Sequence, residues 1–145
     1  MEKHFDINQN GSTLVCVTNQ YQCERLINAG KIIADNTGTS LQVLNVCNTN
    51  GYIDDAAAIE HLYALSKQKG AVMTVVFSDK IADEIIKFSI KTNAKNIITG
   101  MPESEISILN MLWKRLKTVN FFTVSHINTI MPVERLKNES ITKSV

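Results

Sequence analysis

The histidines and cysteines of this 145-residue chain do not stand at spacings that metal binding or nucleophilic catalysis usually needs. The histidines His4, His61 and His126 lie far apart, and none has a second histidine or a cysteine at ligand spacing on the same segment. The cysteines form no Cys-x-x-Cys pair, and three of them cannot all be joined in disulfides. We therefore expect no metal site, and we expect reduced thiols.

Two of the cysteines have contrasting surroundings. Cys16 lies inside an apolar run, where a cysteine usually packs as a small apolar side chain. Cys23 lies near the start of a predicted helix, where the pKa of a thiol can be lowered. A redox role for Cys23 is therefore an alternative to a purely structural one.

The carboxylates offer one candidate acid–base pair. Asp79 follows one apolar run and Glu103 follows a later one, so both could lie at the same edge of a sheet. Both also stand where helices are expected to begin, and we favour a role in capping those helices. The sequence contains no GxxxxGK[ST], GxGxxG, GxSxG or HExxH motif. We predict no catalytic residues.

Alternating apolar runs and helical stripes specify the elements that would position these residues. Five short, β-branched apolar runs cover residues 13–17, 41–47, 72–77, 96–99 and 121–125. The stretches between them carry apolar residues at intervals of three and four, which is typical of amphipathic helices. This alternation predicts an α/β fold, an open parallel sheet with helices on both faces. We expect one such domain over residues 13–126, a flexible segment over 1–12 and a tail over 127–145.

Open parallel sheets bind ligands beyond the carboxyl ends of their strands, which selects a small group of candidate residues. Thr18, Asn19 and Gln20 follow the first predicted strand, and Val46 and Asn48 stand at the end of the second. Their neutral amide and hydroxyl groups suit a small polar ligand or an uncharged nucleoside.

Composition narrows the classes of partner. Fifteen Lys and Arg residues against fourteen Asp and Glu residues leave a net charge of +1, so no global field attracts nucleic acid or an anionic membrane. No apolar run approaches the roughly 20 residues of a membrane-spanning helix, and the polar start is unlike a signal peptide. We expect a cytoplasmic protein with no nucleic acid and no membrane among its partners.

Three segments, residues 13–18, 24–34 and 97–100, resemble the universal stress protein (UspA-like) family over about residues 12–126. The Cys16-Val17-Thr18 run and the following Glu24-Arg25-Leu26-Ile27 run are most similar to the Usp-like domain of Kdp potassium sensor kinases. The resemblance implies a Rossmann-like, five-stranded parallel sheet of order 3-2-1-4-5.

The nucleotide-binding branch of that family carries a G-x2-G-x9-G-[S/T] loop after the fourth strand, where glycines let backbone N–H groups approach phosphates. Gly100 matches the first glycine, but Glu103 and Trp113 stand where the second and third belong. Thr18 replaces the aspartate that contacts adenosine in the family. The chain therefore resembles the branch that does not bind ATP, with Gly100 and Glu103 as further candidate ligand residues.

The resemblance implies a non-enzymatic stress or regulatory protein that acts through a dimer or an unidentified protein partner. No cofactor is expected, and weak or altered adenine-nucleotide binding fits the departures from the loop motif. One alternative is a stress protein that binds ATP, AMP or a cyclic di-nucleotide through an altered loop. Another is an enzyme related to the adenine-nucleotide hydrolases.

The last predicted strand suggests how the chain could assemble. Its residues Phe121, Phe122, Thr123, Val124 and Ser125 would form an unpaired sheet edge, which is an aggregation hazard unless it is covered. We predict a homodimer in which residues 121–131 pair across a two-fold axis. The alternative is a tail that folds back over the edge of its own sheet.

Trp113, which precedes this strand, continues a helical apolar stripe and should pack against the sheet.

Overall fold

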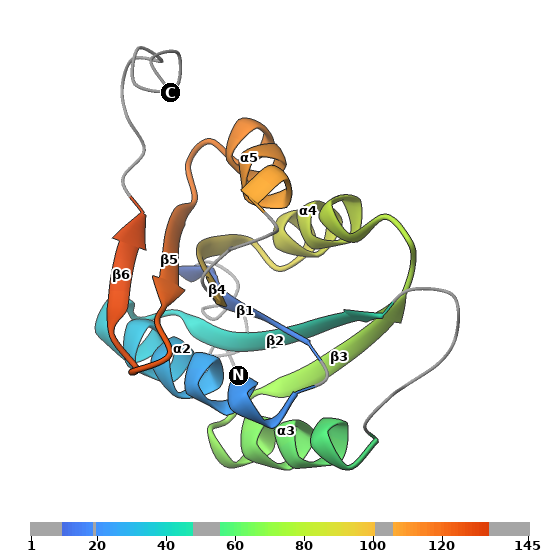
Figure 1. The fold of residues 1–145 in the computed structure, drawn as a ribbon. Coiled ribbons are helices and arrows are strands. Elements are labelled where there is room, and N and C mark those ends of the chain that lie inside the picture. The colour runs from blue at the N-terminus through green and yellow to red at the C-terminus, as the bar shows by residue number, and fades with distance from the viewer. Residues whose placement is uncertain (1–9, 19, 48–55, 101–105, 134–145) are drawn as a thin grey trace, which may run out of the picture.

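The protein is built on a single six-stranded sheet (Figure 1). A computed structural model describes residues 10–18, 20–47, 56–100 and 106–133. The strands are β1 (Ser12–Val17), β2 (Ser40–Cys47), β3 (Val72–Phe77), β4 (Ala94–Gly100), β5 (Asn120–Val124) and β6 (Ile130–Val133). Their order is β3-β2-β1-β4-β5-β6, with β1 to β5 parallel and β6 antiparallel to β5. The predicted α/β class and the order 3-2-1-4-5 are confirmed, and β6 extends the sheet.

Helices cover both faces of the sheet. The helical elements are η1 (Tyr21–Cys23), α2 (Glu24–Thr37), α3 (Ala56–Gln68), α4 (Ile81–Lys91) and α5 (Ile106–Arg115). In Figure 1, α2 and α3 lie on one side of the sheet and α4 and α5 on the other. Each pair packs on its own apolar cluster, so the core has two layers separated by the sheet.

β1 shows why the central strands are apolar at nearly every position. Leu14 belongs to the cluster under α4 and α5, whereas its neighbour Val15 belongs to the cluster under α2. Both side chains are fully buried, because successive residues of a strand point to opposite faces and both faces are covered.

The helix ends follow the sequence in one case and depart from it in another. Gly38 ends α2 in the left-handed conformation (φ 67°), and its N–H bonds to the carbonyl of Ala34. We expected Asp79 to cap α4, and this expectation is wrong. α4 begins at Ile81, so that Lys80 occupies the cap position and makes no side-chain capping bond.

The expectation of a free edge at the fifth strand is wrong. β6 pairs with β5 over its whole length, with Phe121 opposite Val133 and Val124 opposite Ile130. Residues 130–133, which the sequence places in a tail, therefore belong to the sheet. The tail folds back over its own edge, and a homodimer through residues 121–131 stays a prediction that would have to use the edge of β6.

Trp113 packs against the sheet, which confirms its predicted position. Its indole ring is half-buried and meets the ring of Phe121 edge-on, with the ring centroids 6.4 Å apart and an interplanar angle of 83°. α5 is thereby held on β5.

Candidate functional site

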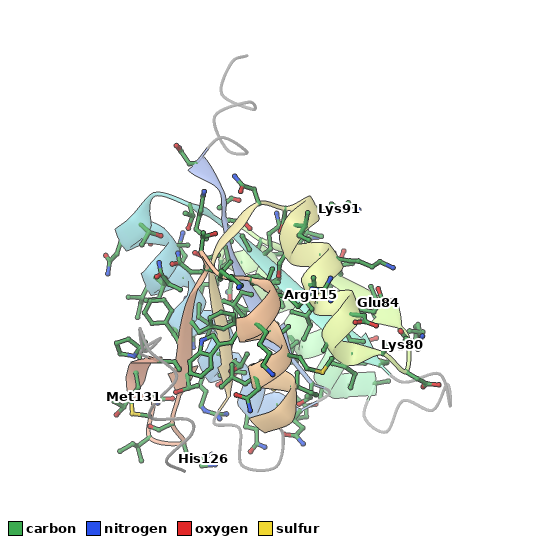
Figure 2. The ribbon with its side chains drawn as sticks, turned by 90° about the horizontal axis from the view of Figure 1, so that it is seen from above. Lys80, Glu84, Lys91, Arg115, His126 and Met131 are labelled. Carbon is green, nitrogen blue, oxygen red and sulfur yellow. The ribbon has the colours of Figure 1, made fainter. Side chains whose placement is uncertain are left out.

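A cavity of about 420 Å³ lies at the carboxyl ends of the parallel strands. Residues at the ends of β1, β2 and β4 meet residues of α2, α4 and α5 around it. In Figure 2, His126 of the cavity wall lies at the opposite end of the molecule from Lys91, which precedes the amino end of β4. The cavity is therefore where a ligand of an open parallel sheet is expected.

The cavity has a polar rim and an apolar floor. The rim carries Thr18, Gln20, Gln22, Arg25, Thr99 and His126, and the floor carries Leu44, Val46, Ile81, Ile85, Leu109 and Leu112. Concave sites of this size with an apolar lining and a few polar groups are typical of small-molecule binding.

The structure brings together four of the seven candidate ligand residues. Thr18, Gln20, Val46 and Gly100 all line the cavity. The other three, Asn19, Asn48 and Glu103, lie outside the described residues. The fold therefore gathers residues from three strand ends that are distant in sequence, as the parallel topology predicts.

Arg25 is the residue of the cavity that the sequence reasoning missed. Its guanidinium Nε–H donates to the carbonyl of Ser125 at 3.0 Å, and Nη1 donates to the carbonyl of Gln22 at 2.8 Å. The remaining nitrogen, Nη2, would lie 3.6 Å from a Cβ atom placed on Gly100. Arg25 thus reaches from the first turn of α2 across to the ends of β4 and β5.

Cys16 and Cys23 both line the cavity, and their surroundings differ. Burial raises the pKa of the Cys16 thiol to about 12, because desolvation disfavours the thiolate. The sulfur of Cys23 lies 3.4 Å from both the backbone nitrogen and the hydroxyl of Thr18, so it ties α2 to the end of β1. The raised pKa keeps the Cys16 thiol protonated at physiological pH, so little of the reactive thiolate is present.

The alternative of an acid–base pair between Asp79 and Glu103 is not tested by the described part of the chain. Asp79 is absent from the cavity lining, and Glu103 lies outside the described residues. Over the described ranges, no three His, Cys, Asp or Glu side chains are grouped as metal ligands would be. His61 pairs with Glu24, with Nε2 and Oε1 2.8 Å apart, away from the cavity.

The position of the family's third glycine lies far along α5. Trp113 stands two residues before Arg115, the last residue of that helix, and lines a second cavity of about 390 Å³, together with Phe121 and Pro132. It is not part of the lining of the strand-end cavity. The family's phosphate-binding motif would extend from position 100 to position 113. In this chain α5 occupies the second half of that range.

Several solved structures of similar fold are universal stress proteins. A universal stress protein in complex with cAMP aligns with a TM-score of 0.61 and 15% identity, over 80% of this chain and 97% of that one. A universal stress protein from Archaeoglobus fulgidus aligns at 0.55 and 16%, over 79% and 92%. One from Archaeoglobus fulgidus in complex with dAMP aligns at 0.53 and 16%, over 79% and 96%.

Comparison of the sequence with protein-family models and with curated proteins gave no match. None of the helices in the described ranges is long and apolar enough to cross a membrane. The likeness is thus one of architecture, carried by the parallel strands, their order and the helices on both faces. The chain has the Rossmann-like α/β fold of the universal stress proteins.

Proposed function

We propose that this chain is a non-enzymatic regulatory protein of the universal stress type, whose strand-end cavity takes a compact, nucleoside-sized ligand rather than ATP. The observation that carries the proposal is the cavity itself, in which Thr18, Gln20 and Thr99 belong to a polar rim above an apolar floor. Its volume of about 420 Å³ suits a small organic molecule. Binding would be read out by an unidentified protein partner.

The case against ATP rests on the missing phosphate cradle. A triphosphate needs several backbone N–H groups brought close by glycines at a helix N-terminus. In this sequence Glu103 and Trp113 take the places of two of the three glycines. Trp113 is packed on Phe121 near the end of α5, so it cannot belong to a phosphate-binding loop at the mouth of the cavity.

The case against catalysis rests on the side chains that line the cavity. The described lining contains no carboxylate, and none of the ion pairs among the described residues joins a carboxylate to its one imidazole, that of His126. Cys16 holds its proton, because burial raises the pKa of its thiol to about 12. Hydrolysis would need an activated nucleophile, and the described lining supplies none.

The alternative is a nucleotide-binding protein with an altered loop. Two proteins of similar fold, in complex with cAMP and with dAMP, favour it as the second candidate. The resemblance of residues 16–18 and 24–27 to the Kdp sensor-kinase domain extends it to cyclic di-nucleotides. The homodimer and the cytoplasmic location remain part of the proposal for either function.

Isothermal titration separates the two functions. We expect adenosine to bind, and ATP and cyclic di-AMP to bind no tighter than about 1 mM, equivalent to a ΔG° of about −4 kcal/mol. A micromolar dissociation constant for ATP would establish the alternative instead. A coupled assay should detect no hydrolysis of ATP.

A pair of matched variants locates the binding. Val46→Phe narrows the cavity at its half-buried floor and should weaken adenosine binding at least about tenfold. Val72→Phe makes the same change on a strand residue that is 63% exposed, and it should leave binding unchanged. Equal effects of the two variants would place the ligand elsewhere.

A further inference from the structure

The outer surfaces of α4 and α5 carry a concentration of positive charge. Among the described residues from 85 to 133 there are six Lys and Arg side chains, all of them exposed, and no Asp or Glu. The six are Lys87, Lys91, Lys95, Lys114, Arg115 and Lys117. We call them the basic surface. Because the whole chain has a net charge of +1, this positive charge is local.

The fold brings the two parts of the basic surface to one end of the molecule. β4 and β5 are neighbouring parallel strands, so Lys95 at the start of β4 and Lys117 just before β5 lie at the same edge of the sheet. α4 packs on α5, and Figure 2 shows Lys91 and Arg115 at the ends of these helices that point away from His126. The basic surface is therefore separate from the strand-end cavity, which His126 lines.

Each of the two helices presents one exposed apolar side chain beside two exposed cations. The residues that share this spacing of i, i+3 and i+4 are Lys87, Ile90 and Lys91 in α4, and Met111, Lys114 and Arg115 in α5. Side chains at such a spacing are neighbours on a helix surface. Ile90 is 69% exposed and Met111 is 46% exposed. Both helices thus offer a partner the same combination of charge and apolar surface.

In the described part of the chain, one of the six cations forms an ion pair. Lys87 lies 3.7 Å from a carboxylate oxygen of Glu84, and the other ion pairs there involve none of the six. A cation near the end of a helix offsets the partial negative charge of that end, which is about half a unit charge. One cation for each helix suffices for that purpose, so the basic surface keeps an excess of positive charge.

We infer that the basic surface binds an acidic, amphipathic segment of a protein partner, with carboxylates against the cations and apolar side chains against Ile90 and Met111. Such segments bind folded proteins through apolar anchors at intervals of three and four, and complementary charge fixes their orientation. The inference rests on the proposed function in one respect, because it gives a chemistry to the partner that reads out the cavity. It does not depend on which ligand the cavity takes.

Two observations favour a protein partner over a nucleic acid or a membrane. Single-stranded nucleic acids stack their bases on exposed aromatic rings, but the aromatic side chains of α4 and α5, Phe88 and Trp113, are half-buried on the core cluster. A helix that lies in a membrane surface buries a broad apolar face in the lipid. The apolar faces of α4 and α5 are packed on the sheet instead, which leaves Ile90 and Met111 as their exposed large apolar side chains within the described part.

The test uses a fluorescent peptide of about 18 residues in which Glu and Leu recur at intervals of three and four, so that a helix would carry them on one face. Anisotropy measures its binding to the full chain, and a peptide with Gln at each Glu position is the reference. We expect the acidic peptide to bind at least about tenfold tighter than the reference and to lose affinity as the salt concentration rises. Equal binding of the two peptides would overturn the inference.

Paired variants locate the bound peptide. Lys91→Glu combined with Arg115→Glu reverses two charges in the last turns of α4 and α5 and should weaken binding at least about tenfold. Lys67→Glu combined with Lys69→Glu is the control, because it makes the same change of charge at the end of α3, on the other side of the sheet. The control should bind the peptide as the unaltered chain does. If the two double variants bind it equally, the peptide does not lie on the basic surface and the inference is wrong.

A second pair of variants tests the apolar contact. Ile90→Ser should weaken binding of the acidic peptide about threefold or more, because an apolar contact is lost. Ile32→Ser makes the same change on α2, at a side chain that is 51% exposed, and should leave binding unchanged. If Ile90→Ser also leaves binding unchanged, charge alone holds the peptide and the amphipathic partner is wrong.

Other occupants of the basic surface are outcomes of the same assay. We expect vesicles of phosphatidylcholine and phosphatidylserine, and a single-stranded oligonucleotide, to bind more weakly than the acidic peptide, and tighter binding of either would overturn the protein partner. A chain ending at Val133 lacks Glu134 and Glu139. If that chain binds the peptide at least about tenfold tighter than the full chain, the occupant is the chain's own tail instead.

The two proposals fail separately. If the peptide does not bind at the basic surface while adenosine binds to the chain, this inference is wrong and the proposed ligand of the cavity stands. If adenosine does not bind and the peptide binds as expected, the proposed ligand is wrong and the basic surface stands.

Discussion

Cys16 shows how the surroundings of one residue decide its chemistry. It lies in β1 and lines the strand-end cavity, but burial raises the pKa of its thiol to about 12 from an ordinary 9.0. The thiolate is the reactive form, so the rate of alkylation by iodoacetamide should keep rising about tenfold per pH unit from about pH 7 to about pH 10. Mass spectrometry after short pulses of reagent measures that rate.

The Cys16→Ser variant assigns the labelled site, and the unfolded chain gives the ordinary thiol as a reference. A rate that levels off near pH 9 in the folded chain would show that the thiol is not desolvated.

The raised pKa of Cys16 also predicts how the stability of the chain changes with pH. Below pH 9.0 the thiol is neutral in both the folded and the unfolded chain. As pH rises from 9.0 toward 12, the unfolded chain releases the thiol proton first, so the free energy of unfolding decreases over this range.

α2 can pack closely on the sheet because residue 30 is a glycine. A Cβ atom added to Gly30 would meet Cγ2 of Val15 at 2.3 Å and Cδ1 of Leu41 at 3.1 Å, and both neighbours are buried. Val15 is β-branched and cannot easily turn away. Gly30→Ala should therefore destabilise the chain by about 1–3 kcal/mol, more than the ~1 kcal/mol that alanine contributes to an α-helix. Thermal unfolding measures the effect.

Gly100→Ala is the matched control for Gly30→Ala. Its added Cβ would meet Nη2 of Arg25 at 3.6 Å and Cδ1 of Leu26 at 4.0 Å, which are ordinary contacts. The melting temperature should change little. If both variants unfold at the temperature of the unaltered chain, α2 does not approach β1 as closely as these distances state.

The elements that could be predicted from the sequence are those whose own residues decide them. β3 covers residues 72–77 as its apolar run predicts, and Gly38 ends α2 because a left-handed residue needs no side chain there. β6 was missed because it has only four residues and contains Pro132, which is rare inside strands. Arg25 was missed because its role depends on Ser125, a hundred residues away, which only the fold brings near.

β6 protects an edge of the whole sheet. At the start of its antiparallel pairing with β5, the N–H of Ser125 donates to the carbonyl of Thr129 at 3.0 Å. From this pair onward, hydrogen-bonded and non-hydrogen-bonded residue pairs alternate along the two strands. Pro132, opposite Phe122, falls at a position whose backbone points away from β5. Proline has no N–H to offer on that outward side, which discourages a further strand from pairing with β6.

Removing β6 should therefore expose the edge of β5 and cause self-association. A chain ending at Asn128 lacks β6, together with the packing of Ile130 and Val133 against the two core clusters. We expect it to unfold at a lower temperature and to show a larger mass by light scattering at tens of micromolar, because the backbone groups of Phe121 to Val124 are left unpaired. A chain ending at Val133 keeps β6 and should match the full chain in both measurements. If the chain ending at Asn128 keeps the mass of the full chain, β6 does not protect the edge, and the two-fold pairing of residues 121–131 becomes the better account of assembly.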